Sequence, residues 1–217
     1  MLKLIELLKI NDLKYTDEIK PKHQKKIDMQ TEIFKGEVSV PIKPFPENSS
    51  KKTLSELEWL RDLNNGEIDK KYVKEGDDII PLFKKYCKVN ELDFDVKYYE
   101  KVLKESAKTI LSLKYYYNRP RPIQLAEFYG LEEFKNMDLP SMNTPAYPSG
   151  HSTQGHLIAL LLTKENPTHY NGLQEIANHI SKSRLMARAH YPSDCEFGRR
   201  VAMLIAGRIN GRWLLSS

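Results

Sequence analysis

The segment from Leu92 to about Tyr116 constrains the fold most, because its apolar side chains recur at the period of an α-helix. These side chains are Tyr99, Val102, Leu103, Ile110, Leu111 and Leu113. The pattern stops at the sequence NRPRP, where Pro120 and Pro122 cannot lie in a helix interior because proline has no backbone N–H to donate. We therefore predict one long helix that ends in a rigid, proline-bounded segment.

Other segments show helical patterns, and none alternates apolar and polar residues as a half-buried strand would. Further helices are expected from Thr53 to residues 64–66, and over 78–89, 149–165, 171–189 and 192–214. The sequence TLSE at Thr53 has the form of a capping box. The helix at 149–165 is apolar all round in its middle, which is typical of a buried helix. We expect an all-α fold, a single-domain helical bundle with a buried central helix.

Length and composition fit one sizeable globular domain, since 40% of the 217 residues are hydrophobic and 29% are charged. Residues 1–50 are polar, with room for two short helices and a proline-rich loop at 40–50. We expect them to form an N-terminal extension that packs on the bundle. Residues 51–217 then form the main helical domain.

Charge and apolar runs argue against several partners. The net charge of +5 fits an anionic ligand, but the sequence has no long basic block, zinc spacing or aromatic RNA-binding motif, so nucleic acid is not expected. The most apolar run, 157–162, is far too short to span a bilayer. No signal-peptide pattern is seen, which predicts a cytoplasmic protein, or a periplasmic or secreted one if a leader was removed. Cys87 and Cys195 are expected to be free thiols.

The first candidate functional stretch is KYYYNRPRP, in which Lys114 closes the long helix and Arg121 lies in the proline-bounded segment after it. In a purely structural interpretation, these cations at a helix C-terminus interact with the helix dipole and have no other role. A lysine and an arginine can also clamp a phosphate, because arginine donates two parallel hydrogen bonds and lysine supplies a compact point charge.

The second stretch is Pro148-Ser149-Gly150-His151, at the predicted start of the 149–165 helix. Ser149 could be an ordinary helix cap. Backbone N–H groups at a helix start also form an anion site, and Gly150 would let a ligand come close. His151 on the first turn could then be held protonated by that anion and give a proton to a leaving group.

The third stretch is SRLMARAHYPSD, which contains Arg184, His190 and Asp194. His190 and Asp194 could form a purely structural hydrogen bond on a surface turn. The carboxylate could instead fix the imidazole tautomer and leave the other ring nitrogen free as a nucleophile. Arg184 would be a third cationic donor to a bound anion.

Taken in order, Lys-x6-Arg-Pro, Pro-Ser-Gly-His and Ser-Arg-x5-His-x3-Asp form a known signature. At all the specified positions the sequence resembles the superfamily of type 2 phosphatidic acid phosphatases and vanadium haloperoxidases. The stretches lie close together, 26 residues from Pro122 to Pro148 and 32 from His151 to Ser183. On a chain of this size, such spacing looks most like the soluble bacterial class A nonspecific acid phosphatases.

This resemblance implies an all-α, metal-independent phosphomonoesterase that acts on a small, soluble phosphate ester through a phosphohistidine. The phosphate-binding residues would be Lys114, Arg121, Ser149, Gly150 and Arg184. His190 would attack phosphorus, and Asp194 would orient it. His151 would protonate the leaving alcohol and then activate water. No cofactor is expected, and vanadate should inhibit.

Some positions depart from the pattern or have no assigned role. Arg188 stands where the superfamily usually has glycine, and it either points away or adds charge near the pocket. Arg119 is a spare cation without an assigned role. The remaining histidines are expected to be structural or on the surface, namely His23, His156, His169 and His179.

Two other functions stay open. A vanadate-dependent haloperoxidase would hold vanadate as a cofactor in the same pocket. A non-catalytic module would bind a phosphate ligand without turnover. A homo-oligomer is possible, and the sequence does not specify the substrate within the class of soluble phosphate esters.

Overall fold

The computed structural model describes residues 4–34 and 38–209, and within them it confirms the all-α prediction. The α-helices are α1 (Leu4–Asp12), α2 (Pro21–Ile27), α3 (Lys51–Asp62), α4 (Lys70–Glu75), α5 (Ile79–Val89), α6 (Val96–Tyr117), α7 (Pro122–Ala126), α8 (Gly150–Glu165), α9 (Tyr170–Met186) and α10 (Pro192–Ala206). Short 3₁₀ turns are η1 (Leu63–Gly66), η2 (Pro140–Met142) and η3 (Pro167–His169). In the described ranges, β-pairing is limited to one antiparallel bridge between Phe34 and Ile209.

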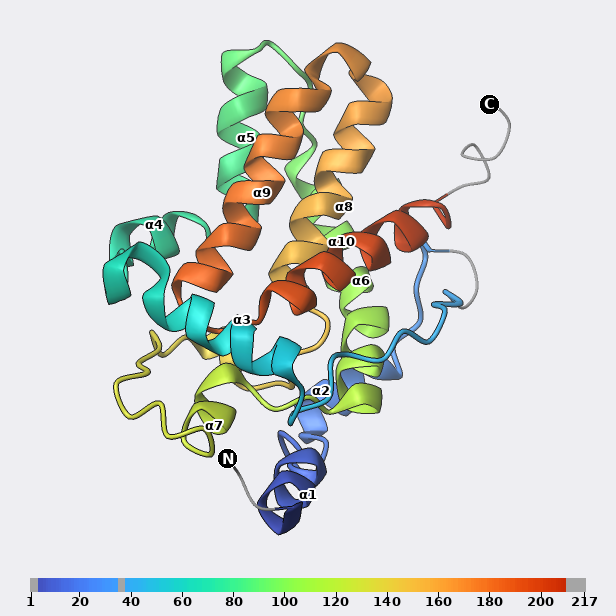
Figure 1. Ribbon diagram of the computed structural model, residues 1–217. Helices are drawn as coiled ribbons and strands as arrows, with labels where there is room; N and C mark the ends of the chain where they lie inside the picture. Colours follow the sequence, from blue (N-terminus) through green and yellow to red (C-terminus); the bar gives the residue numbers. More distant parts are fainter. Residues whose placement is uncertain (1–3, 35–37, 210–217) are drawn as a thin grey trace.

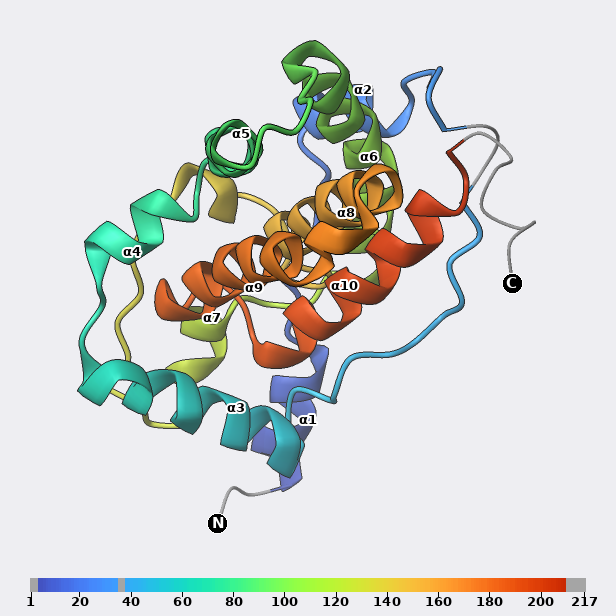
Figure 2. The same cartoon turned by 90° about the horizontal axis from the view of Figure 1, so that it is seen from above.

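Helix α8 is the buried centre of the bundle, as its apolar sequence predicts. It packs most closely on α9 and α10, with α5 and α6 on its other sides, and Figure 2 shows it surrounded by these helices. The side chains of Leu157, Ile158 and Leu162 are completely buried. Burying such side chains stabilises the fold by about 1.5–3 kcal/mol each.

The long predicted helix is α6, and local chemistry sets both of its ends. Asp95 caps its start by accepting a hydrogen bond from the Tyr98 N–H at 3.1 Å, so the helix begins four residues after Leu92. Asn118 ends it in the left-handed conformation, with φ 50°. The following prolines then direct the chain into α7.

Several predicted boundaries were wrong. Helix α3 begins at Lys51 and not at Thr53, because Ser50 is the cap and accepts a hydrogen bond from the Thr53 N–H at 3.1 Å. The short helices α4 and α7 were not predicted, since neither is long enough to show a period. Helix α10 ends at Ala206, and residues 210–214 of the predicted helix lie outside the described residues.

The N-terminal segment contacts the bundle along its length. Tyr15 donates to the Met142 carbonyl at 2.8 Å, and the buried carboxylate of Glu105 on α6 accepts from the backbone N–H groups of Glu32 and Ile33. The division of the chain at residue 50 stays a prediction. Among residues 4–34 and 38–209, no helix combines the length and the hydropathy needed to cross a membrane.

Candidate active site

The three sequence stretches meet at one end of the bundle. The C-terminal ends of α6 and α9 and the N-terminal ends of α8 and α10 lie together there (Figure 1). Gly198 allows α10 to lie this close to α8, because a Cβ at this position would be only 2.8 Å from the Ser149 carbonyl oxygen. The Ser149 N–H donates in turn to the Asp194 carbonyl at 3.0 Å.

His190 and Asp194 form a buried pair. His190 Nδ1 lies 3.2 Å from Asp194 Oδ2, which also accepts a hydrogen bond from the Tyr191 N–H at 2.9 Å. The other ring nitrogen, Nε2, lies 2.9 Å from Arg121 Nη1. Because a guanidinium can only donate, Nε2 must be the acceptor and Nδ1 carries the proton. The pair therefore holds the imidazole in the tautomer whose Nε2 is unprotonated, with its lone pair directed at Arg121.

Electrostatics keep this imidazole neutral. Burial lowers the pKa of His190 well below its usual range, and the charges of Arg121 and Lys114 lower it further, although the hydrogen bond to Asp194 opposes this. Burial raises the pKa of Asp194, but Arg119 and the other neighbours outweigh it and bring the value down to about 2. An ionised Asp194 thus faces a neutral His190.

Lys114 and Arg121 are buried basic side chains that donate to uncharged acceptors. Lys114 Nζ donates to the carbonyls of Pro145 at 2.5 Å and Ala146 at 3.5 Å. Arg121 donates to three backbone carbonyls, to the Thr144 hydroxyl and to His190. Among the residues that the structure describes, neither cation forms an ion pair with a carboxylate. Burial lowers the pKa of both groups, that of Arg121 to about 10, so a bound anion would relieve a real electrostatic cost.

Ser149 and Gly150 place the start of α8 beside these cations. Ser149 is the cap of the helix, with its hydroxyl oxygen 3.4 Å from the Ser152 nitrogen, so the expected capping role is present. Gly150 faces Lys114, because a Cβ on Gly150 would lie 3.8 Å from Lys114 Cε. The N–H groups of Gly150 and His151 have no acceptor within the described part of the chain. Such N–H groups are the anion-binding feature of a helix start.

His151 and Arg184 are joined by a carboxylate that the sequence did not reveal. Asp77, in the turn between α4 and α5, lies 2.5 Å from Arg184 Nη1 and 3.3 Å from His151 Nε2. The hydrogen bond with His151 and the charge of Arg184 lower the pKa of Asp77 to about 2, against the effect of burial. Burial lowers the pKa of His151, and Asp77 opposes that shift.

Arg119 is a second residue without a role assigned from sequence. Its buried guanidinium donates to Asp194 Oδ1 at 2.5 Å and to the Ser193 hydroxyl at 2.8 Å, and it lies 3.8 Å from the centre of the Tyr191 ring. Glu56 on α3 completes the network at 3.5 Å from the same guanidinium. The oxygen of Asp194 that does not face His190 is thus fixed by an ion pair. The sequence feature that could have indicated a role for Arg119 is its position in NRPRP, two residues before Arg121.

Arg188 points away from the site. It adopts φ 54°, the left-handed region that favours glycine, and its guanidinium donates to the carbonyls of Leu60, Arg61, Gly66 and Lys135. These hydrogen bonds connect the end of α3, the η1 turn and the loop at Lys135 to the turn before His190. Of the two orientations considered from sequence, the structure shows the one that adds no charge to the site.

A cavity of about 320 Å³ leads to this cluster. Its lining includes Lys114, Thr144, Gly150 and His151. The side chain of His151 is 20% exposed, whereas the other ionisable members of the cluster are buried apart from Asp77. The cavity therefore reaches the cluster at Lys114, Gly150 and His151, whereas Arg121, Arg184 and His190 do not line it.

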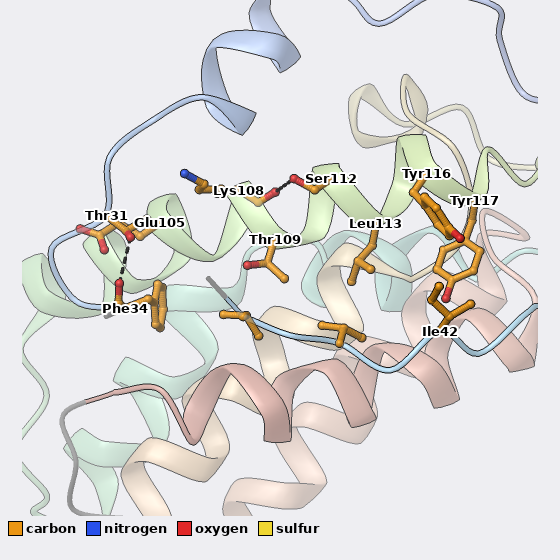
Figure 3. A pocket seen from close by; sticks show the side chains of 12 residues that line it. Thr31, Phe34, Ile42, Glu105, Lys108, Thr109, Ser112, Leu113, Tyr116 and Tyr117 are labelled. Atoms are coloured by element: carbon orange, nitrogen blue, oxygen red, sulfur yellow. Dashed lines mark hydrogen bonds between the residues drawn. The ribbon is translucent and has the colours of Figure 1, made fainter. Parts of the chain in front are cut away.

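A larger cavity of about 430 Å³ lies elsewhere, between α6 and the extended chain before α3. Figure 3 shows Phe34 and Ile42 of that chain opposite Thr109, Leu113 and Tyr117 of α6. Tyr116 and Tyr117 of the first stretch line it, but none of the candidate catalytic or phosphate-binding residues does. Size alone thus does not identify the site.

Within residues 4–34 and 38–209, no group of three or more histidine, cysteine, aspartate or glutamate side chains is placed to hold a metal ion. Cys87 and Cys195 are buried free thiols, as expected from sequence.

Comparison with known proteins agrees with the geometry. A non-specific acid phosphatase of Salmonella typhimurium is 32% identical to the chain over 98 residues, which cover 45% of this chain and 38% of the relative. Similar proteins of the same name come from Providencia stuartii, 32% identical over 42% of this chain and 36% of the relative, and from Salmonella typhi, 31% identical over 45% and 38%. The chain therefore matches less than two fifths of the length of these curated relatives.

The model of the PAP2 superfamily matches residues 103–211, half of the chain, and this range contains all three stretches. It runs from the middle of α6 through α10, the elements whose ends meet at the cation cluster. On this sequence match, the chain belongs to the PAP2 superfamily.

Proposed function

We propose that this protein hydrolyses small phosphate monoesters through a covalent phosphohistidine on His190. The observation that carries the proposal is that Lys114 and Arg121 are buried without an ion-pair partner among the described residues, and that Arg121 contacts the unprotonated Nε2 of a neutral imidazole. A phosphate dianion is the ligand that such a cluster lacks. The name shared by the three relatives, non-specific acid phosphatase, supports the same chemistry.

In the first step the phosphate oxygens take over hydrogen bonds that Lys114, Arg121 and Arg184 now make elsewhere, and the N–H groups at the start of α8 add to them. His190 Nε2 then forms a bond to phosphorus while the ester P–O bond breaks. Asp194 accepts a hydrogen bond from the Nδ1–H group, remains ionised, and stabilises the positive charge that develops on the ring.

His151 completes both half-reactions. It gives its proton to the leaving oxygen, and the alcohol departs through the cavity that His151 lines. The neutral imidazole then takes a proton from water, the water oxygen attacks phosphorus, and the N–P bond breaks to release inorganic phosphate. The cationic side chains supply the charge stabilisation throughout, so the scheme requires no cofactor. The cytoplasmic location stays a prediction.

The direct test is hydrolysis of 4-nitrophenyl phosphate between pH 5 and 8 in EDTA, with and without vanadate. We expect turnover that survives EDTA and is inhibited by vanadate, which adopts the five-coordinate geometry of the transferring phosphoryl group. Halide oxidation that requires vanadate and peroxide, without ester hydrolysis, would support the haloperoxidase instead. Tight phosphate binding without either activity would support the binding module.

Asp77 is proposed as the positioning residue for His151. Because Asp77 raises the pKa of His151, Asp77→Asn should lower that pKa, and the alkaline limb of the kcat profile should move to lower pH. A hydrogen bond to a charged group contributes about 1.5–3 kcal/mol, and Asp77 is 38% exposed, so we expect the low end, a loss of roughly tenfold on that limb.

The matched control is Asp78→Asn, which removes the same charge from the exposed neighbour. Its pH profile should coincide with that of the wild type. An Asp77→Asn profile that is lowered equally at every pH would show that the carboxylate only holds Arg184 and does not act on His151.

A further inference from the structure

The cavity that leads to the reactive cluster has a second group of cations at its outer wall. Lys22 and Lys26 of α2 line it together with Lys114, Gly150 and His151. The two lysines are four residues apart on a helix and therefore share one face. Both are exposed, and no carboxylate lines this cavity among the residues that the structure describes. The charged side chains that line the cavity are thus all basic.

Helix α2 is held in this place by a specific contact. His23, between the two lysines, is buried, and its Nδ1 lies 2.6 Å from the hydroxyl of Tyr115 on α6. Tyr115 is the residue after Lys114, so the contact fixes α2 beside the reactive cluster. Burial lowers the pKa of His23, and the charges of Lys22, Lys20, Lys26 and Lys114 lower it further, which shows that these cations act on one small region.

A concentration of like charge at a cavity mouth has an electrostatic cost. Lysines at positions i and i+4 repel each other and destabilise a helix slightly. Charges around a cleft also raise the local concentration of an oppositely charged ligand. In the proposed reaction, the leaving group departs past His151 and so lies in this cavity, between the reactive phosphate and α2.

We propose that Lys22 and Lys26 form a subsite for a second anionic group, so that the preferred substrates are phosphate monoesters whose leaving group itself carries a phosphate or a carboxylate. This inference rests on the proposed function and adds the substrate class. Helix α2 lies outside the range of the superfamily match, so this specificity belongs to the N-terminal segment of this chain.

Two matched esters separate the subsite from the reactive centre. Butane-1,4-diyl bisphosphate and 4-hydroxybutyl phosphate share the same carbon chain and the same scissile bond, but only the first has a second anion. The symmetric bisphosphate has two equivalent scissile phosphates, so its kcat/KM is expected to be about twice that of the monoester on statistical grounds alone. At low salt we expect its kcat/KM to exceed that of the monoester by a further factor of about 5–30. Because both lysines are exposed, this factor should shrink as salt is raised to about 1 M, where the Debye length is about 3 Å.

The double variant Lys22→Glu/Lys26→Glu should bring the ratio of the two kcat/KM values down to about two or below. The control is Lys25→Glu, an exposed lysine of the same helix that does not line the cavity, and it should keep the wild-type ratio. Ethane-1,2-diyl and hexane-1,6-diyl bisphosphates, each with its monoester, would then find the length that reaches α2 best.

The outcomes distinguish the two proposals. The ratio of the kcat/KM values of each bisphosphate and its monoester decides the subsite. If the wild type shows a ratio near two at all three chain lengths, or if the double variant keeps the wild-type preference, the subsite proposal is wrong and the phosphatase proposal stands. If the wild type hydrolyses none of these esters, the phosphatase is wrong and the subsite falls with it. A preference that the double variant loses and Lys25→Glu keeps supports both.

Discussion

His190→Ala should abolish phosphate ester hydrolysis, with kcat reduced by about 10⁴-fold or more, because no other group can take the place of the attacking nitrogen. The loss should be similar for aryl and alkyl esters, since the nucleophile is needed whatever the leaving group is. Steady-state rates in EDTA for 4-nitrophenyl phosphate and 4-hydroxybutyl phosphate test this directly.

The same variant tests the covalent intermediate. Wild-type enzyme that is quenched in alkali during turnover should carry one phosphoryl group on histidine, because phosphorus–nitrogen bonds are labile in acid and persist in base. His190→Ala should carry none. His179→Ala is the matched control, since the ring of this histidine on α9 packs against the Tyr72 ring and has no role in the proposed mechanism, and it should keep both activity and labelling.

Thermal unfolding and phosphate binding complete the test of the nucleophile. His190→Ala should still unfold cooperatively and bind inorganic phosphate, because Lys114, Arg121 and Arg184 remain. A folded His190→Ala protein with more than about 1% of the wild-type kcat would rule out the phosphohistidine mechanism.

His151→Ala should have the second largest effect, and its size should depend on the leaving group. Loss of a general acid costs about 10²–10⁴ in rate. We expect this full loss for 4-hydroxybutyl phosphate, whose alkoxide must be protonated as it leaves. The 4-nitrophenolate is stable without a proton, so the first half-reaction with 4-nitrophenyl phosphate should be much less affected.

The two substrates therefore separate the two roles of His151. In the variant, 4-nitrophenyl phosphate should give a burst of nitrophenolate followed by a slow phase, because the phosphohistidine forms but lacks the base that activates water. Alkaline quenching in the slow phase should find the phosphoenzyme accumulated. Equal losses for both esters, without a burst, would show that His151 only shapes the pocket.

Local patterns were sufficient to predict the helices that build the site. The period of α6, the proline stop after it and the apolar middle of α8 are properties of neighbouring residues, and such properties can be read along the chain. The cap at Ser50 was missed because TLSE is an equally good local pattern three residues later. The structure settles the choice, since the Thr53 hydroxyl donates to the Glu47 carbonyl at 2.7 Å.

The residues of the three stretches were predicted from sequence because their types suit phosphate chemistry and their order resembles the signature of a known superfamily. The His190–Asp194 pair is four residues apart across a helix start, and its hydrogen bond is nearly local. Their supports could not be found in the same way. Asp77 meets Arg184 across 107 positions, and Arg119 meets Asp194 across 75, distances at which no local pattern reports contact.

The sequence by itself therefore determined the all-α fold class, because helical periods are local information. It also predicted the reactive groups of the candidate site, and their roles stay predictions. Tertiary structure alone decided which carboxylate holds His151, where Arg188 points and which surface forms the mouth of the cavity. The position of α2 shows the reason. PKHQKKI has the composition of any solvated basic helix, and its contacts with α6, among them that of His23 with Tyr115, place two of its lysines at the cavity.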